Sequence, residues 1–325
     1  STETAEWVQA QNKVTFGYLE NIPYRSEIQE RLKNMWNFEK FSIPSREGEY
    51  IYYSRNDGRQ NQYVVYRQKG DGESEIFLDP NKFSADGTTS LGETGFSRDG
   101  SRMAYSISEG GSDWRKIITI DAISREIIGD TLRDIKFSGI SWKGNEGFYY
   151  SSYDRPSGSE LSAMTDHHKL YYHRAGTPQS EDVIVFGADL KRRYVSGYVT
   201  DDGRYLVISA SVSTTGNELY IMDLSTKKKW SVSEAFDSNV ESFIWSQDGS
   251  EIYFTGSWHG RLSVFCTDLR GKIKMINNED CDYLSLAWAE NRLITSRQSM
   301  TNPTEIFSLD VERSLAEHIS HENDH

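Results

Sequence analysis

Two patterns of apolar positions divide the chain. Over residues 5–36, apolar residues recur at intervals of three and four, as they do on one face of a helix, and Pro23 interrupts the run. We therefore expect two helices, at about 3–20 and 24–35, which form an arm that packs on the body of the protein. From Phe38 onward, apolar and polar residues alternate in short runs rich in Tyr, Ile and Val, which is typical of β-strands.

The strand pattern repeats with a period of 40–50 residues. Each copy has an apolar strand, a turn of the Asp-Gly type, a second apolar strand, a polar loop and a third strand that ends near Asp. Six copies can be followed, and their first halves are FSIPSREGEYIYYSR (41–55), GFSRDGSRMAYSIS (95–108), GISWKGNEGFYYSS (139–152), GYVTDDGRYLVISA (197–210), FIWSQDGSEIYFTG (243–256) and LAWAENRLITSR (286–297). We expect a fourth, outer strand after each copy, at 74–79, 125–130, 181–186, 228–233, 272–277 and 316–320.

The turns and the residues before them have distinct physical roles. A hairpin turn needs positive φ, which glycine adopts at low cost. The turns are expected at Gly48, Gly100, Gly144, Gly203, Gly249 and Glu290-Asn291. The aromatic residues just before the turns are expected to pack between sheets, and they are Phe96, Trp142, Tyr198, Trp245 and Trp288.

A single four-stranded sheet cannot bury both of its faces, whereas six sheets arranged radially bury each face against a neighbour. The sequence therefore predicts an all-β fold, a six-bladed β-propeller of four-stranded antiparallel blades, with seven blades as the alternative. The expected domains are a helical arm at 1–37, the propeller at 38–320 and a tail at 321–325. The strands of each blade follow one another along the chain. We therefore expect no C-terminal strand in the first sheet, and a ring closed by side-chain packing between the first and last blades.

Composition narrows the choice of partners and compartment. The net charge of −13 over 325 residues repels polyanions, so nucleic acid is not expected as a partner, while basic peptides and cations remain compatible. No run of eighteen apolar residues occurs, so no membrane span is expected. The first residues, STETAEW, lack the features of a signal peptide, and the compartment stays unknown. Cys266 and Cys281 are predicted to be unpaired thiols.

The clearest candidate for catalysis is the string GSWHG (256–260), which brings Ser257 and His259 close together in sequence. The nucleophile elbow of hydrolases, G-x-S-x-G, does not occur in the sequence. We therefore interpret GSWHG as the loop before the third strand of the fifth blade, and predict no catalytic residue.

Histidines offer two candidate metal sites, and neither is favoured. His167 and His168 follow Asp166, but neighbouring side chains on a strand point to opposite faces. His318, His321 and His325 lie at the chain end, where two histidines three apart on a helix could chelate a metal adventitiously. No P-loop, dinucleotide fingerprint or EF-hand occurs, so no cofactor and no metal site are predicted.

Several strings resemble a known family. Residues 6–222 are similar to the propeller of prolyl oligopeptidase through WVQAQN (7–12), YYSRNDGRQNQYVVY (52–66), FSRDGSRMAYSISEGGSDW (96–114), HKLYYHRAGTPQSEDVIVF (168–186) and YVTDDGRYLVIS (198–209). Residues 235–320 look more like the last propeller blades of dipeptidyl-peptidase and acyl-peptide-hydrolase relatives. This change of resemblance leads to the hypothesis of an engineered or recombined chimera with a junction near 222–235.

The resemblance implies a role beside a catalytic domain. In the family, an α/β-hydrolase domain carries the catalytic residues, and the propeller restricts entry to small peptides and contributes to the pocket wall. Phe137, in IKFSGISW, matches such a wall position. Three functions follow: a non-catalytic propeller scaffold, the substrate-gating fragment of a serine peptidase, or a module that binds peptides or proteins. Self-association and a peptide ligand are the partners left open.

Overall fold

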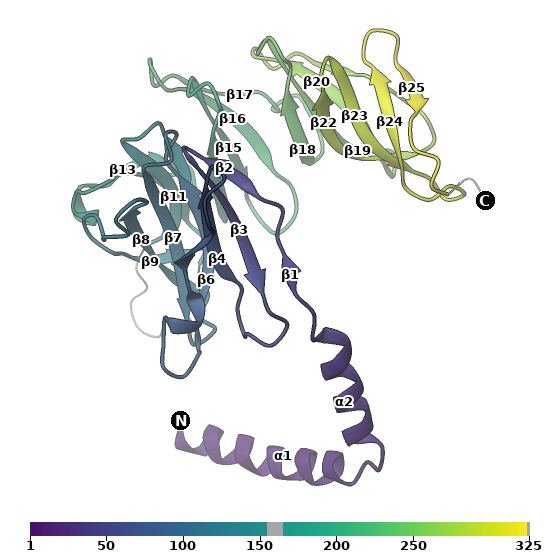
Figure 1. The fold of residues 1–325 in the computed structure, drawn as a ribbon. Coiled ribbons are helices and arrows are strands. Elements are labelled where there is room, and N and C mark those ends of the chain that lie inside the picture. The colour runs from purple at the N-terminus through teal and green to yellow at the C-terminus, as the bar shows by residue number, and fades with distance from the viewer. Residues whose placement is uncertain (155–164, 324–325) are drawn as a thin grey trace. The chain divides into compact units, whose positions relative to one another are not determined.

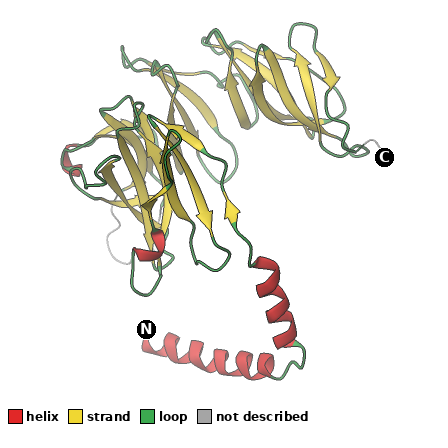
Figure 2. Ribbon diagram, viewed as in Figure 1, coloured by secondary structure: helices red, strands yellow, loops and turns green. Residues whose placement is uncertain are grey.

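The computed structural model describes residues 1–154 and 165–323, which contain two α-helices followed by strands and two short 3₁₀ helices (Figures 1 and 2). These residues fall into two compact units. The first comprises Ser1–Ser90 and Glu109–Gly111, and the second comprises Leu91–Ser108 and Ser112–His325. The predicted all-β class with a helical arm is confirmed.

Both predicted helices form. Helix α1 (Thr2–Glu20) begins after Ser1, whose hydroxyl accepts a hydrogen bond from the amide of Thr4 at 3.2 Å. Helix α2 (Arg25–Trp36) starts two residues after Pro23. No residue of either helix is buried, and the packing of this arm on the body of the protein stays a prediction. Neither helix combines the length and apolarity needed to cross a bilayer.

The first sheet has five strands, because its first strand is split in two. Strands β1 (Lys40–Phe41) and β2 (Ser45–Glu47) both pair with β3 (Tyr50–Asn56). Pro44 lies between them, and proline has no N–H to donate to a sheet. The sheet continues with β4 (Val64–Lys69) and β5 (Glu75–Leu78).

Five four-stranded antiparallel sheets follow, each built from strands consecutive along the chain. The second sheet consists of β6 (Thr89–Phe96), β7 (Arg102–Glu109), β8 (Trp114–Asp121) and β9 (Leu132–Lys136), and the third of β10 (Ser141–Lys143), β11 (Gly147–Tyr153), β12 (His168–Arg174) and β13 (Val183–Phe186). The fourth consists of β14 (Tyr194–Val199), β15 (Tyr205–Ser211), β16 (Glu218–Asp223) and β17 (Lys229–Ser231), and the fifth of β18 (Val240–Trp245), β19 (Glu251–Trp258), β20 (Arg261–Asp268) and β21 (Ile273–Met275). The sixth consists of β22 (Asp282–Ala289), β23 (Arg292–Gln298), β24 (Glu305–Asp310) and β25 (Leu315–His318). Six sheets, and a first sheet without any C-terminal strand, are as predicted for the residues described.

Three of the repeated turns, in the second, fourth and fifth sheets, share one hydrogen-bonded design. In the fifth sheet, the Asp248 carboxylate accepts hydrogen bonds from the Ser246 hydroxyl at 2.6 Å and from the Ser250 amide at 3.1 Å. These bonds, the one from Ser246 first, lower the pKa of Asp248 to about 2. Asp99 and Asp202 accept equivalent bonds in the second and fourth sheets. All six predicted turn residues have positive φ: Gly48, Gly100, Gly144, Gly203, Gly249 and Glu290.

One predicted outer strand is wrong. Residues 125–130 form no strand, and the outer strand of the second sheet is β9, a few residues later. Arg125 and Gly129 both have positive φ, which breaks an extended run. Gly129 also lies against Gly176, whose Cα would be 2.7 Å from a Cβ at this position. Ile127 therefore forms only an isolated bridge with Ile120, the backbone turns at Gly129, and strand pairing with β8 resumes at Leu132.

The apolar core of the second unit lies between successive sheets. Clusters of buried side chains join the second sheet to the third, the third to the fourth, the fourth to the fifth and the fifth to the sixth. Trp142 and Trp288 donate indole hydrogen bonds to carbonyls of the preceding sheet, at Gly95 (2.8 Å) and Trp245 (2.6 Å). Tyr198 is the exception among the predicted core aromatics, because its side chain is exposed. Cys266 and Cys281 are buried in the last cluster as free thiols, as predicted.

Replacing Gly147 by alanine tests how closely two strands approach in the third sheet. A Cβ at Gly147 would lie 2.1 Å from the carbonyl oxygen of His173 on the neighbouring strand. The backbone of β12 would have to move, so we expect the free energy of unfolding to fall by about 1–3 kcal/mol. Urea denaturation would measure this change. Gly139→Ala is the matched control, since no atom lies within 4 Å of its Cβ position, and an equal loss in both variants would contradict the explanation.

Candidate functional site

The Ser257 and His259 pair belongs to a hairpin. Ser257 and Trp258 are the last residues of β19, and Trp258 pairs with Arg261. His259 and Gly260 form the two-residue turn, with φ of 50° and 79°, the backbone that a type I′ turn requires. GSWHG is therefore a strand end and a turn rather than a whole loop. Ser257 and His259 are both exposed, and nothing in the described hairpin orients one toward the other as a nucleophile and base.

Asp166, His167 and His168 are directed to three different partners. The Asp166 carboxylate forms an ion pair with Lys191 at 2.6 Å. His167 Nε2 lies 2.6 Å from the carbonyl oxygen of Gly187. His168 is fully buried and bonds to two backbone groups. Residues 1–154 and 165–323 contain no group of three His, Cys, Asp or Glu side chains placed to hold a metal ion.

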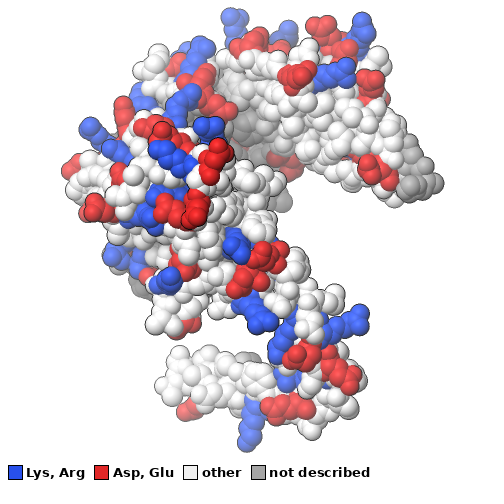
Figure 3. Space-filling model, in the orientation of Figure 1, with Lys and Arg blue, Asp and Glu red and all other residues white. Residues whose placement is uncertain are grey.

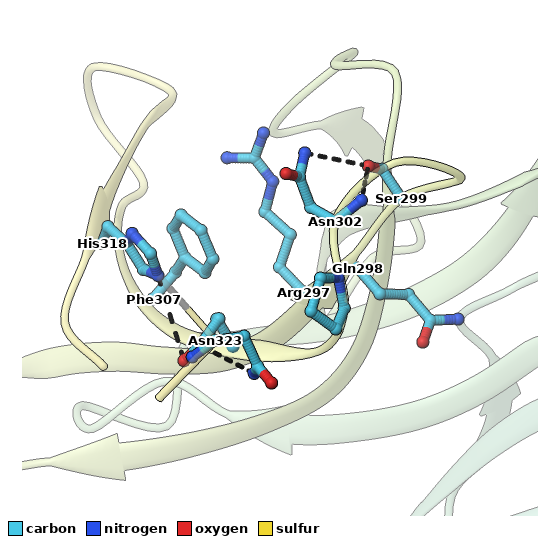
Figure 4. Close-up of a pocket in the computed structure, with 9 residues that line it drawn as sticks. Arg297, Gln298, Ser299, Asn302, Phe307, His318 and Asn323 are labelled. Carbon is cyan, nitrogen blue, oxygen red and sulfur yellow. Dashed lines mark hydrogen bonds and ion pairs between the residues drawn. The ribbon is translucent and has the colours of Figure 1, made fainter. Parts of the chain in front are cut away.

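One histidine near the chain end, His318, lines a small cavity on the sixth sheet (Figure 4). His318 lies on strand β25 rather than on a helix, and its ring stacks on Phe307 at 4.5 Å. The ring of His321 lies 4.4 Å from it, and His325 is outside the described residues. The cavity has a volume of about 290 Å³ and is lined by Arg297, Gln298, Ser299, Asn302, Pro303, Glu305, Phe307, His318 and Asn323.

The polar groups of this cavity mainly bond to one another. Glu305 accepts hydrogen bonds from the Ser320 hydroxyl and from both nitrogens of Asn323, and these bonds, the one from Ser320 first, lower its pKa. Arg297 pairs with Glu279 at 3.2 Å and covers the Phe307 ring. The carboxylates are thus held by donors of the chain itself, so the cavity offers no reactive constellation.

Phe137 is the exposed member of a group of three aromatic rings. It directly follows β9, has φ of 53°, and its side chain is about half exposed. The rings of Tyr153 and Tyr194 meet it edge-on, with centroids at 6.4 and 5.8 Å. The Lys136 ammonium lies 5.1 Å from the centre of the Phe137 ring. We call Phe137, Tyr153 and Tyr194 the aromatic wall; they come from three successive sheets or the loops between them.

His168 lies directly beside this wall. Its ring stacks on Tyr153 with centroids 4.3 Å apart. Its Nε2 donates to the carbonyl oxygen of Lys136 at 2.9 Å, and its Nδ1 accepts from the amide of Val195 at 2.9 Å. A carbonyl can only accept and an amide can only donate, so these partners fix the neutral Nε2–H tautomer. Burial lowers the pKa of His168 to about 4.

A second buried histidine belongs to a network in the third sheet. His173 Nδ1 lies 2.7 Å from one oxygen of Asp182, and Tyr150 donates its hydroxyl to the other oxygen at 2.8 Å. Burial, and then the charge of Asp182, raise the pKa of Tyr150. An Asp–His pair of this kind orients the base in serine hydrolases. Here the remaining nitrogen, Nε2, has no hydrogen-bond partner in the described part of the chain, and the centroid of the His173 ring lies 5.2 Å from that of Phe148.

Sequence reasoning named Phe137 as a candidate wall residue and did not name Tyr153 or Tyr194. Tyr153 and Tyr194 are far from Phe137 in sequence, and no local pattern joins them. His168 was considered only as a metal ligand. Its true contacts lie on strands of two neighbouring sheets, which a linear motif does not reveal.

Comparison with known proteins identifies the family of the chain. Residues 1–260 match the family model described as the prolyl oligopeptidase N-terminal beta-propeller domain. The chain is 52% identical over 254 residues to the prolyl endopeptidase of Elizabethkingia meningoseptica, covering 77% of this chain and 36% of that protein. It is 54% identical over 241 residues to the prolyl endopeptidase of Elizabethkingia miricola, covering 73% and 34%.

Solved structures agree in fold. A structure from a study of two prolyl endopeptidases superposes with a TM-score of 0.75 at 28% identity, covering 99% of this chain and 47% of that one. Prolyl oligopeptidase B from Galerina marginata, bound to a 35mer substrate, superposes with a TM-score of 0.85 at 23% identity, covering 100% and 49%. The chain thus spans about a third of the curated relatives and about half of the solved chains. It belongs to the prolyl oligopeptidase N-terminal β-propeller family.

Proposed function

We propose that this chain is the non-catalytic, substrate-gating propeller of a prolyl-oligopeptidase-type serine peptidase. One observation carries the proposal: helices α1 and α2 contain no buried residue and yet have apolar faces. A helical face of this kind needs a partner to bury it, and the relatives that match this chain are roughly two to three times longer. The partner we propose is the catalytic domain of the peptidase.

The apolar faces are regular. In α1, Trp7, Val14 and Tyr18 follow intervals of seven and four, which places them on one side of the helix, and all are exposed. The surface of α1 shows few charged side chains in Figure 3. In α2, Ile28, Leu32 and Met35 follow intervals of four and three and are exposed as well. Helices without tertiary packing are marginally stable in water, so these two are expected to need a docking surface.

The absence of independent activity is the first test. We expect the 325-residue chain to release no p-nitroaniline from succinyl-Gly-Pro-p-nitroanilide, under conditions where a full-length prolyl endopeptidase does. Turnover that purifies with the chain and is abolished by a serine-directed inhibitor would refute the non-catalytic part of the proposal.

Docking is tested separately by hydrogen exchange. We expect the amides of α1 and α2 to exchange rapidly in the chain alone, and to gain protection when the catalytic part of the Elizabethkingia meningoseptica relative is added. Trp7→Ser should weaken this protection. Ile43→Ser, an exposed apolar change outside the helices, is the matched control. Equal loss of protection in both variants, or no protection at all, would count against the gating role.

A peptide-binding module is the second candidate, and the exposed ring of Phe137 in the aromatic wall favours it. Aromatic rings provide apolar contact area at low entropic cost and are common in recognition surfaces. A proline-containing peptide should then raise the melting temperature of the chain alone, and Phe137→Ala should abolish the increase. If the melting temperature does not rise at millimolar peptide, the chain alone does not bind the peptide, and only the gating role remains proposed.

We also propose that the last two sheets derive from a different propeller lineage, with a junction near 222–235, within a propeller spanning 38–320. The string resemblance of residues 235–320 supports this origin, as does the end of the family-model match at residue 260. That match nevertheless runs through the junction itself. A natural coding sequence that continues without interruption from residue 200 to 320 would contradict a chimera.

A further inference from the structure

We propose that His168 is the positioning residue of Phe137: it fixes the backbone that presents the Phe137 ring on the exposed side of the aromatic wall. The contact of this wall with peptides rests on the proposed function, whereas the positioning does not. His168 contacts no ligand in this scheme and acts through the strand end that precedes Phe137.

The backbone at Phe137 needs support. Its φ of 53° lies in the left-handed region, which is sterically unfavourable for a residue with a Cβ. Such conformations persist where neighbouring groups hold them. Lys136, the last residue of β9, has its carbonyl fixed by His168 Nε2 at 2.9 Å, one residue before the strained position.

One imidazole thereby joins three sheets. His168 begins β12 in the third sheet, its Nε2 bonds to the end of β9 in the second, and its Nδ1 bonds to Val195 of β14 in the fourth. The ring is fully buried, and both of its nitrogens are satisfied by backbone groups. A group with two fixed partners in a dry site defines the separation of the strands that it joins.

The ring of His168 also packs against the aromatic wall. His168 stacks on Tyr153 at 4.3 Å, and Tyr153 in turn meets the Phe137 ring and donates its hydroxyl to the carbonyl of Arg193 at 2.6 Å. Arg193 directly precedes Tyr194, the other member of the wall. His168 therefore reaches Phe137 by two routes, through the backbone of Lys136 and through the ring of Tyr153.

Two amide substitutions separate the two hydrogen bonds. In His168→Asn, the side-chain oxygen can accept from Val195 as Nδ1 does, but the shorter chain cannot reach Lys136. In His168→Gln, the amide nitrogen extends toward the position of Nε2 and can donate to Lys136. If His168 only filled space in the core, His168→Gln would not be expected to restore the position of Phe137 that His168→Asn disturbs.

The experiment places 4-fluorophenylalanine at position 137 and records its ¹⁹F NMR signal in the full chain without ligand. We expect His168→Asn to shift and broaden this signal, and His168→Gln to restore it toward that of the parent. A label at Phe265, buried in the fifth sheet, reports on folding and should not change. An unchanged Phe137 signal in folded His168→Asn, or equal disturbance by both variants, would overturn the proposal.

Two further outcomes are informative. If His168→Asn loses the Phe265 signal and does not fold, the test rests on His168→Gln. A Phe137 signal like that of the parent then supports the positioning role of His168, and an altered signal refutes it. A proline-containing peptide added to the parent tests the proposed function instead. Failure of the peptide to move the Phe137 signal would count against a peptide-facing wall and leave the positioning role unaffected.

Discussion

Replacing Phe254 by alanine is expected to lower the free energy of unfolding by about 3–5 kcal/mol. Phe254 is 1% exposed and lies in the cluster between the fourth and fifth sheets. Its ring stacks on Phe265 at 5.4 Å and meets Phe236 edge-on at 5.1 Å. The substitution removes the buried ring and leaves a cavity that rigid strands cannot close, so both the transfer and the cavity cost apply.

Urea denaturation followed by tryptophan fluorescence would measure the effect. Val212→Ala is the matched control, because its side chain is exposed in the same unit, and we expect it to change stability by less than about 0.5 kcal/mol. A loss below about 1 kcal/mol for Phe254→Ala would mean that the fourth and fifth sheets do not share the core described above.

Acidification is expected to remove about 3 kcal/mol of stability through His168 alone. Burial lowers the pKa of this imidazole from 6.5 to about 4, so the folded protein binds its proton less readily than the unfolded chain does. The contribution is therefore complete above pH 6.5, falls as the pH drops from 6.5 to 4, and changes no further below 4.

A comparison of two proteins isolates this contribution from those of the carboxylates. The free energy of unfolding of the parent and of His168→Gln should be measured from pH 8 to pH 4. The parent is expected to lose about 3 kcal/mol more than the variant over the lower part of this range, since glutamine does not titrate. Parallel pH profiles would show that His168 is already protonated in the folded protein or remains solvated.

Most of the architecture could be predicted from local sequence because the repeat specifies it locally. Turn residues such as Gly249 need positive φ, and the adjacent Asp248 accepts bonds within its own turn, so both signals lie within a few residues. The wrong predictions concern residues whose conformation depends on groups far away in the sequence. The outer strand at 125–130 failed because the chain turns at Gly129 against Gly176, nearly fifty residues away. Tyr198 was assigned to the core by its position before a turn, although its side chain is exposed.

The candidate site was predictable only in part. Phe137 was found through resemblance, but the wall depends on contacts between sheets, and His168 bonds to groups 32 residues before and 27 residues after it. The rule that neighbouring side chains on a strand point to opposite faces does not reveal the partners of a buried imidazole such as His168. Those partners are set by the register of three sheets, which the sequence of one strand does not encode.

The location of the core between successive sheets has a consequence for how the second unit unfolds locally. Each cluster of the second unit joins a sheet to its immediate neighbour, so stability there is approximately a sum of nearest-neighbour terms, as in a one-dimensional chain of coupled units. Within this unit, the third, fourth and fifth sheets each share one cluster with the sheet before them and one with the sheet after them. Opening of one sheet in this unit should therefore weaken the core of its neighbours first, which gives graded amide protection along the chain rather than a single cooperative value.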